Sequence, residues 1–229
     1  LLSNALHAIA EHARQGAAAL TVFNPNGWAQ TGLVPFEWED ALVDPVVSDG
    51  ENLYSVQKTA DGAWLFRANA VPAKGWQQYA VLPRTDVKTK ELIYRESGTL
   101  AASLHHLEND YLKVTLDQNG QFSSIYDKKA GRELLKAGKN GNVLMTYEDR
   151  PHNYDAWDVN NYYVEKSWEV TDVQHLSLIE DGPLRATIQV VRRYLDSEIT
   201  QYISLEADSP ELKIRNEIDW REQKIFLKT

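Results

Sequence analysis

Cysteine is absent from this 229-residue chain, and methionine occurs only once. Without thiols the chain forms neither disulfide bonds nor thiolate metal sites. This absence fits a reducing compartment, and we expect a cytoplasmic location. Long apolar runs are also lacking, since none approaches the roughly 20 residues of a membrane-spanning helix. We therefore expect no membrane partner.

Positive charge is scarce as well. The chain has 24 Lys and Arg against 33 Asp and Glu, a net charge of −9. Binding to nucleic acid or to an anionic membrane would need a basic patch, so we expect neither partner. Seven Trp and eleven Tyr are a generous share, and 43% hydrophobic residues are ordinary for a globular protein. The length suffices for one large or two medium domains.

The first half of the chain combines one helical pattern with many short apolar runs. An apolar stripe at helical spacing predicts a helix over residues 1–15, with Gly16 just beyond its end. Turn signals such as Asn24-Pro25-Asn26-Gly27 then separate short strands. Their close spacing predicts a small immunoglobulin-like β-sandwich over residues 18–84. The polar stretch 85–103, in which residues 92–94 could form an edge strand, is the predicted linker.

The second half shows longer strands. Asn119-Gly120 predicts a hairpin between residues 111–116 and 122–126. We then expect long strands over residues 164–179, 184–195, 198–205 and 211–220. The second and the fourth of these runs alternate apolar and polar residues well, which indicates antiparallel strands with one face in water. Residues 104–229 are therefore predicted to form a large antiparallel β-sandwich, and the fold class to be mainly β.

Residues 147–165 have neither helical nor strand periodicity and predict a long ordered loop. The run places acids, amides and large aromatics side by side. Aromatic rings cover the C–H faces of sugars, while Asp and Asn hydrogen-bond to hydroxyls, so this composition indicates carbohydrate binding. The structural alternative is a loop that caps the end of a sandwich, with Trp157 as a core plug.

The chemistry within this loop favours binding over catalysis. A retaining glycosidase needs two carboxyl groups about 5–5.5 Å apart. Asp155 and Asp158 are three residues apart and would meet only on a helical turn, so we assign no catalytic residue. We predict instead that Asp155, Trp157 and Asp158 bind substrate. His152 is the one local histidine, too few for a zinc site, and we predict no metal here.

Three runs of the sequence resemble glycoside hydrolase family 38, the α-mannosidases, in its bacterial and cytosolic branch. One is Glu148-Asp149-Arg150-Pro151 with Tyr154-Asp155-Ala156-Trp157-Asp158-Val159. The second is Val22-Phe23-Asn24-Pro25-Asn26-Gly27-Trp28, similar to the entry strand of the family's first β-domain. The third is Leu107-Glu108-Asn109-Asp110-Tyr111-Leu112-Lys113-Val114 with Gly120 and Ser124-Ile125-Tyr126-Asp127-Lys128, similar to the opening hairpin of its large sandwich. The three runs follow the family's order.

The resemblance implies a division of the chain. Residues 1–17 would end a linking helical bundle, and residues 104–229 would form a truncated large sandwich of the galactose-mutarotase-like kind. In that family the zinc ion and the aspartate nucleophile sit on an N-terminal barrel, which nothing here matches. The expected chain is thus a β-domain portion of an α-mannosidase, inactive alone and without a cofactor of its own. The expected partners are a mannose-containing oligosaccharide, that barrel and, as an oligomer, further copies of itself.

Two other functions stay open at this point. One is a stand-alone carbohydrate-binding β-sandwich module, and the other is a sandwich of the mutarotase or epimerase kind. Each would share the strands and the aromatic loop. A barrel that carries zinc ligands and an aspartate nucleophile would favour the mannosidase.

Overall fold

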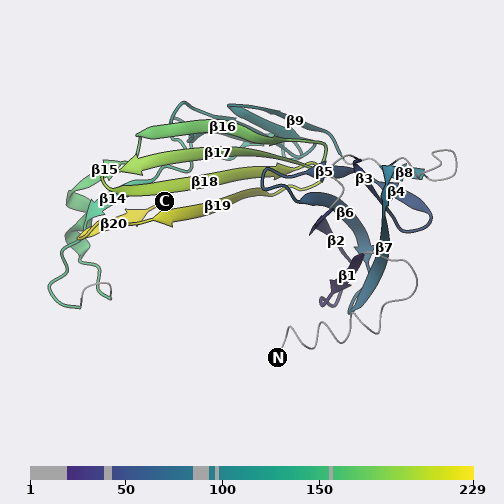
Figure 1. The fold of residues 1–229 in the computed structure, drawn as a ribbon. Helices are drawn as coiled ribbons and strands as arrows, with labels where there is room; N and C mark the ends of the chain where they lie inside the picture. Colours follow the sequence, from purple (N-terminus) through teal and green to yellow (C-terminus); the bar gives the residue numbers. More distant parts are fainter. Residues whose placement is uncertain (1–19, 39–42, 85–92, 96–97, 155–156) are drawn as a thin grey trace. The chain divides into compact units, whose positions relative to one another are not determined.

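Figure 1 shows the computed structural model, which describes residues 20–38, 43–84, 93–95, 98–154 and 157–229. Strands make up nearly all of its regular structure, so the predicted mainly-β class is confirmed. The predicted helix over residues 1–15 lies outside the described residues. The chain divides into two compact units: Leu1–Gly98 with Gly182–Leu184, and Thr99–Asp181 with Arg185–Thr229.

The described residues of the first unit form two sheets. One has the strand order β1-β7-β3-β4-β8, in which β8 runs parallel to β4 at the edge, and the other has the order β2-β6-β5. The edge strand expected near residues 92–94 is therefore present. The strands are β1 (Leu20–Asn24), β2 (Gln30–Phe36), β3 (Pro45–Ser48), β4 (Asn52–Tyr54), β5 (Val56–Lys58), β6 (Trp64–Val71), β7 (Gly75–Pro83) and β8 (Ile93–Arg95).

Aromatic rings fill the core of the first unit. Phe66, which is fully buried, contacts Tyr79 edge-on at 4.8 Å between ring centroids, and also Phe36 and Tyr54. Edge-to-face pairs of this kind add about 0.5–1.5 kcal/mol each beyond the area that they bury. Residues of both sheets supply the rings, so these contacts hold the sheets together.

In the second unit, the residues that the structure describes form three sheets, with the orders β13-β12-β11-β10-β9, β15-β14-β20 and β16-β17-β18-β19. Figure 1 shows the long strands β16–β19 side by side. The elements are β9 (Leu100–Ser103), β10 (His106–Asn109), β11 (Leu112–Leu116), β12 (Phe122–Asp127), β13 (Arg132–Glu133), β14 (Met145–Glu148), the 3-10 helix η2 (Asn161–Glu165), β15 (Ser167–Glu169), β16 (Val173–Asp181), β17 (Arg185–Tyr194), β18 (Ser197–Glu206), β19 (Leu212–Asp219) and β20 (Ile225–Lys228).

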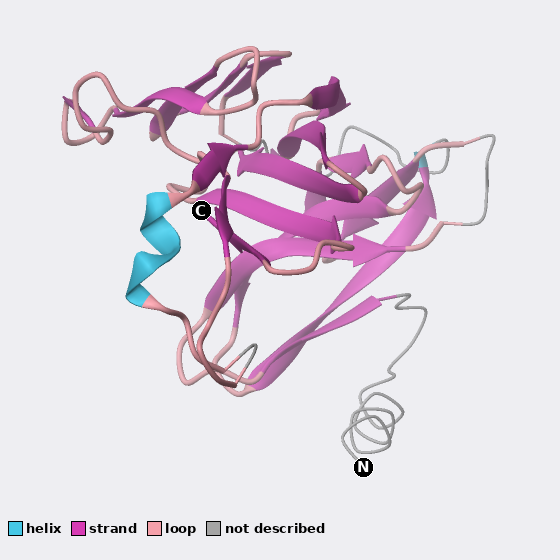
Figure 2. Ribbon diagram, turned by 90° about the vertical axis from the view of Figure 1, so that its left-hand side faces the viewer, coloured by secondary structure: helices cyan, strands magenta, loops and turns pink. Residues whose placement is uncertain are grey.

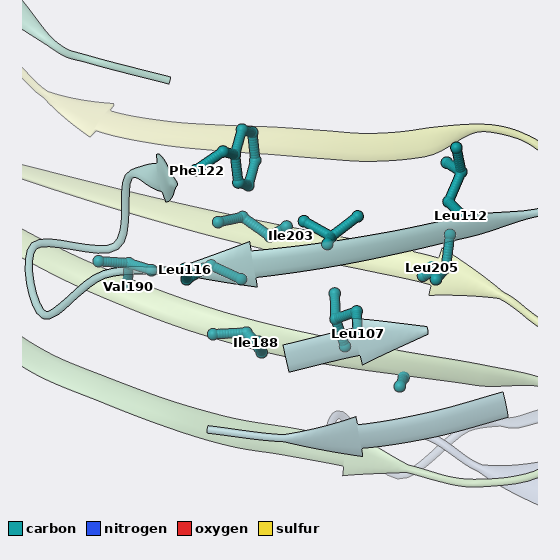
Figure 3. Packing of buried hydrophobic residues seen from close by; sticks show 10 residues of the cluster. Leu107, Leu112, Leu116, Phe122, Ile188, Val190, Ile203 and Leu205 are labelled. Carbon is teal, nitrogen blue, oxygen red and sulfur yellow. The ribbon is translucent and has the colours of Figure 1, made fainter. Parts of the chain in front are cut away.

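The main core of the second unit lies between the sheet of β9–β13 and the sheet of β16–β19 (Figure 3). Alternation explains it: Leu107, Val114, Ile188 and Ile203 each point inward, and their sequence neighbours point outward. The full cluster is Leu107, Leu112, Val114, Leu116, Phe122, Ala186, Ile188, Val190, Ile203 and Leu205. A second cluster of Leu144, Val170 and Ile199 lies nearer the sheet of β14.

A buried charge lies beside this core. Arg192 of β17 is 1% exposed, and its Nη2 donates to the carbonyl of Asn119 at 2.7 Å. Its Nη1 donates to Oε1 of Gln201 at 2.5 Å, and Gln201 is bound in turn by Asn142 at 3.0 Å. Burial lowers the pKa of Arg192 to about 10, with the charge of Asp117 opposing the shift. The acceptors of these hydrogen bonds, the carbonyl of Asn119 and the amide oxygen of Gln201, are thus neutral groups and not carboxylates.

Most predicted strands are confirmed, and one prediction is wrong. The hairpin at Gly120, whose φ is +68°, joins β11 and β12 as expected. The single strand expected over residues 164–179 does not form, because this stretch is divided among η2, β15 and β16. Val170 is buried against Leu144 and Ile199, so the chain turns inward there and moves from one sheet to another. Apolar content alone did not reveal that turn.

Candidate functional site

A loop leaves the three-stranded sheet after β14 and returns at β15. The backbone N–H of Glu148 donates to the carbonyl of Lys166 at 3.1 Å, which closes the base of the loop. The backbone N–H of Asp149 donates to Lys224 at 2.7 Å, which ties the outgoing chain to the segment before β20. The loop therefore starts from a fixed base.

The last turn of the loop is the helix η2, drawn in cyan in Figure 2. The Asn160 side chain caps it by accepting from the N–H of Tyr162 at 3.3 Å. The sequence predicted a loop over residues 161–163 and, from residue 164 on, the start of a strand as well, so the helical turn over residues 161–165 is a correction. The capping asparagine is the signal that could have revealed it.

Three aromatic rings fix η2 to the sheet. Tyr163 lies edge-on to Tyr147 of β14 at 5.1 Å and to Phe226 of β20 at 5.7 Å. The ammonium of Lys228 lies 5.7 Å from the centre of the Tyr163 ring. Because this contact set joins three elements, it holds the returning arm of the loop in place.

Charged groups meet at the base of the loop. Glu148 accepts from Arg150 and from Lys166, each at 2.8 Å. The hydrogen bond from Lys166 is the main cause that lowers the pKa of Glu148, and desolvation opposes it only in part. The side chains of both cations are largely exposed, so these pairs orient groups more than they stabilise the fold.

A cavity of about 120 Å³ opens among these groups. Its lining combines carboxylates, cations, an amide and phenols: Glu148, Arg150, Asn160, Tyr162, Tyr163, Glu165 and Lys166. An apolar cavity of about 150 Å³ holds a six-membered ring. A cavity with this polar lining suits a small, hydroxyl-rich group.

The structure places two of the three predicted binding residues. Trp157 is 86% exposed and Asp158 is exposed, and the backbone N–H of each donates to the carbonyl of Tyr154 at 2.9 and 3.0 Å. Tyr154 itself has φ +59°, an uncommon backbone conformation for a residue other than glycine. Asp155 lies outside the described residues. The alternative in which Trp157 plugs a core is wrong, because its indole lies in solvent.

Residues 107–229 match the model of the glycosyl hydrolases family 38 C-terminal domain. This stretch is 123 of the 229 residues of the chain. The chain belongs to glycosyl hydrolase family 38. Its C-terminal domain contains the loop, the cavity and the main core of the second unit.

Curated relatives of this family 38 chain are α-mannosidases by name. Human and mouse "Alpha-mannosidase 2C1" are each 30% identical to it over 124 residues, and "Alpha-mannosidase G" of Dictyostelium discoideum is 28% identical over 125. These alignments cover 53%, 53% and 51% of this chain, but only 12%, 12% and 11% of the respective relatives. The similarity therefore concerns a short stretch of much longer proteins.

A zinc site in this family 38 chain would need at least three converging ligand side chains. Among the described residues, no three His, Asp or Glu side chains lie close enough together to hold a metal ion. Zinc, which the resemblance implies for the parent enzyme, therefore does not fit this part of the chain. Nor does any helix within the described ranges have the length and apolar character to cross a membrane.

Sequence reasoning missed several residues of this family 38 site. Tyr163, Lys166 and Glu148 line the cavity, yet none was predicted to be a site residue. Their juxtaposition depends on the pairing of β14 with β20, in which Tyr147 lies opposite Phe226. No local pattern reports a pairing across that separation in sequence, whereas the two adjacent tyrosines after Asn160 were a visible signal.

Proposed function

We propose that this chain is the β-domain portion of an α-mannosidase that hydrolyses α-linked mannose with retention. It would supply scaffold and one wall of the sugar cleft. The match of residues 107–229 to the family 38 C-terminal domain carries the proposal. The names of the curated relatives support α-mannosidase as the activity.

Within that function, we assign substrate binding to Asp155, Trp157 and Asp158. The support is chemical: Trp157 exposes most of its ring, and an acid stands close by on the same loop. A carboxylate that accepts from sugar hydroxyls contributes about 1.5–3 kcal/mol as a charged hydrogen bond. An exposed indole covers the C–H face of a pyranose.

The proposal includes a domain division and partners. Residues 18–84 would be a small bracing sandwich, 85–103 a linker that also supplies the edge strands β8 and β9, and 104–229 part of the large sandwich. The substrate would be a mannose-containing oligosaccharide, and the partner would be a barrel of the same enzyme in the cytoplasm. That barrel would hold the zinc ion, because the described residues of this chain offer no ligand set for it.

Kinetics on the full-length enzyme test the binding loop. Asp155→Asn and Trp157→Ala should lower kcat/KM toward an oligomannoside by roughly tenfold each, the equivalent of about 1.4 kcal/mol. If the contacts strengthen in the transition state kcat falls, and if they are uniform KM rises. Asp196→Asn, in the exposed turn between β17 and β18, is the matched control and should leave both constants unchanged.

Two outcomes would count against the proposal. Unchanged kinetic constants together with a lowered melting temperature in Asp155→Asn would assign the loop to structure. The isolated chain should not hydrolyse an aryl α-mannoside, with or without added zinc. Turnover that copurifies with the chain would instead place the catalytic groups inside it.

A further inference from the structure

Two further exposed tryptophans lie in the first unit, outside the loop described above. Trp28, between β1 and β2, is 65% exposed, and Trp76 at the start of β7 is 50% exposed. Trp76 pairs with Phe23 of β1 at 6.3 Å between ring centroids. Phe23 follows Val22, which packs on the core, so Phe23 and Trp76 point away from that core.

A buried asparagine fixes the turns that carry these tryptophans. Asn24 is 3% exposed, and its Nδ2 donates to the carbonyls of Trp28 at 2.7 Å and Val71 at 2.9 Å. Its Oδ1 accepts from the N–H of Asn26 at 3.0 Å. One side chain therefore joins the β1–β2 connection to the end of β6. We call residues 24–31 and 70–78 together the tryptophan tip.

The backbone of the tryptophan tip is strained and well supported. Ala70 and Lys74 have φ of +49° and +48°, a left-handed conformation that is strained for residues other than glycine. The N–H of Ala70 donates to Oγ1 of Thr31 at 2.9 Å, and that of Lys74 to the carbonyl of Asn26 at 2.9 Å. Strain of this kind persists where the surroundings fix the conformation, and it gathers at binding sites.

The composition of the tryptophan tip indicates its ligand. Among its seventeen residues only Lys74 is charged, although 25% of the whole chain is charged. Besides the buried Asn24, four amide residues of the tip are at least partly exposed, and they accompany the two tryptophans: Asn26, Gln30, Gln77 and Gln78, with Trp28 and Trp76. Indole faces with amides beside them match the C–H faces and hydroxyls of a sugar. A charged partner would find almost no complementary group here.

We propose that the tryptophan tip binds a neutral oligosaccharide by stacking it on Trp76 and Trp28. The tip belongs to the first unit, whereas the loop that carries Trp157 belongs to the second. The inference goes beyond the proposed function and rests on it only for the choice of a mannose-based probe. Such a site would retain a long substrate near the enzyme while the reaction proceeds elsewhere.

Fluorine NMR on the full chain tests this site. The seven tryptophans are labelled as 5-fluorotryptophan, and each signal is assigned by a single Trp→Phe variant. Mannotriose should shift the Trp28 and Trp76 signals saturably and leave Trp38 and Trp64, which are packed in the core of the first unit, in place. Trp76→Ala should raise the mannotriose concentration at half-saturation, measured at the Trp28 signal, by roughly five- to tenfold, in line with the loss of one aromatic contact.

The controls make each outcome decisive. Trp28→Ala, measured at Trp76, gives the same test if Trp76→Ala lowers the melting temperature. The site is refuted if mannotriose shifts neither signal, if glycerol shifts them equally, or if protein dilution alone shifts them, since dilution would reveal contact between copies. The Trp157 signal reports the loop separately. Shifts at Trp28 and Trp76 without one at Trp157 would support this site and count against the loop.

Discussion

The main core of the second unit and the loop after β14 are both rich in large apolar residues, yet they differ completely in burial. Every member of the core cluster is at most 6% exposed. In and next to η2, Trp157, Tyr162 and Val164 are 86%, 66% and 59% exposed. The core residues alternate with outward-facing residues along strands that pair with neighbouring strands, whereas these three loop residues lie outside the sheets. Burial here follows strand pairing and not apolar content.

The largest effect that sharpens this comparison is expected at Ile203 of β18. Its side chain is fully buried, so Ile203→Ala should lower the free energy of unfolding by about 2–5 kcal/mol through lost burial and a cavity. Ile218 of β19 is 47% exposed and is the matched control, with an expected loss below about 2 kcal/mol. Urea unfolding measures both. Equal losses would contradict the assigned difference in burial.

A glycine pair separates backbone strain from packing. Gly120 and Gly138 have φ of +68° and +70°, so alanine at either position costs about 1–2 kcal/mol of strain. At Gly120 the added Cβ would lie 2.7 Å from Val190, whereas at Gly138 it would meet nothing within 4 Å. Gly120→Ala should therefore lose roughly 1–3 kcal/mol more, from overpacking. Thermal unfolding of both variants measures this, and equal losses would mean that the hairpin moves away from β17 freely.

The stability of the first unit should depend on pH in the alkaline range because its core contains a buried tyrosine. Burial raises the pKa of Tyr79 to about 12, and the charge of Asp49 adds to the shift. The unfolded chain loses this proton near its ordinary pKa of about 10. The contribution to stability is thus complete below about pH 10 and is lost as the pH rises toward about 12.

Urea midpoints recorded across that alkaline range test the shift. Tyr79→Phe should flatten the decline, while Tyr162→Phe, at a residue that is 66% exposed, should leave it unchanged. A decline of the same slope in Tyr79→Phe would show that another group governs alkaline unfolding.

The smallest change in stability is expected at Trp157. Since its indole is 86% exposed, Trp157→Ala should change the free energy of unfolding by less than about 0.5 kcal/mol. The melting temperature measures this directly. A fall of several degrees would show that the loop buries its tryptophan after all, and the contrast with the core would disappear.

Much of the fold could be predicted because the signals are local. Gly120 after Asn119 marks one hairpin, and the alternation through Ala186, Ile188 and Val190 marks an inward face. The division at Val170 could not be predicted, because its burial depends on Leu144 and Ile199, which lie far away in sequence. Local patterns report which residues can be buried, but they do not report which sheet receives them.

The site was less accessible from sequence than the fold. Acids and aromatics in one loop pointed to residues 155–158, and two of those predicted to bind, Trp157 and Asp158, are exposed in the structure. The cavity at the base of the same loop could not be foreseen, because Tyr163, which lines it, is held there by contacts with Tyr147 and Phe226. Those residues come from strands whose pairing no local pattern announces.

The buried Arg192 makes the stability of the second unit depend on the register of β17. Its guanidinium needs the carbonyl of Asn119, 73 residues earlier in the chain, and the amide of Gln201 across the sheet. A slip of one residue in β17 would turn this charge to the opposite face and leave both acceptors unmatched. We expect sheets in a wrong register to be too unstable to persist. Many registers would bury apolar residues with similar energy, and the buried cation favours the native one among them.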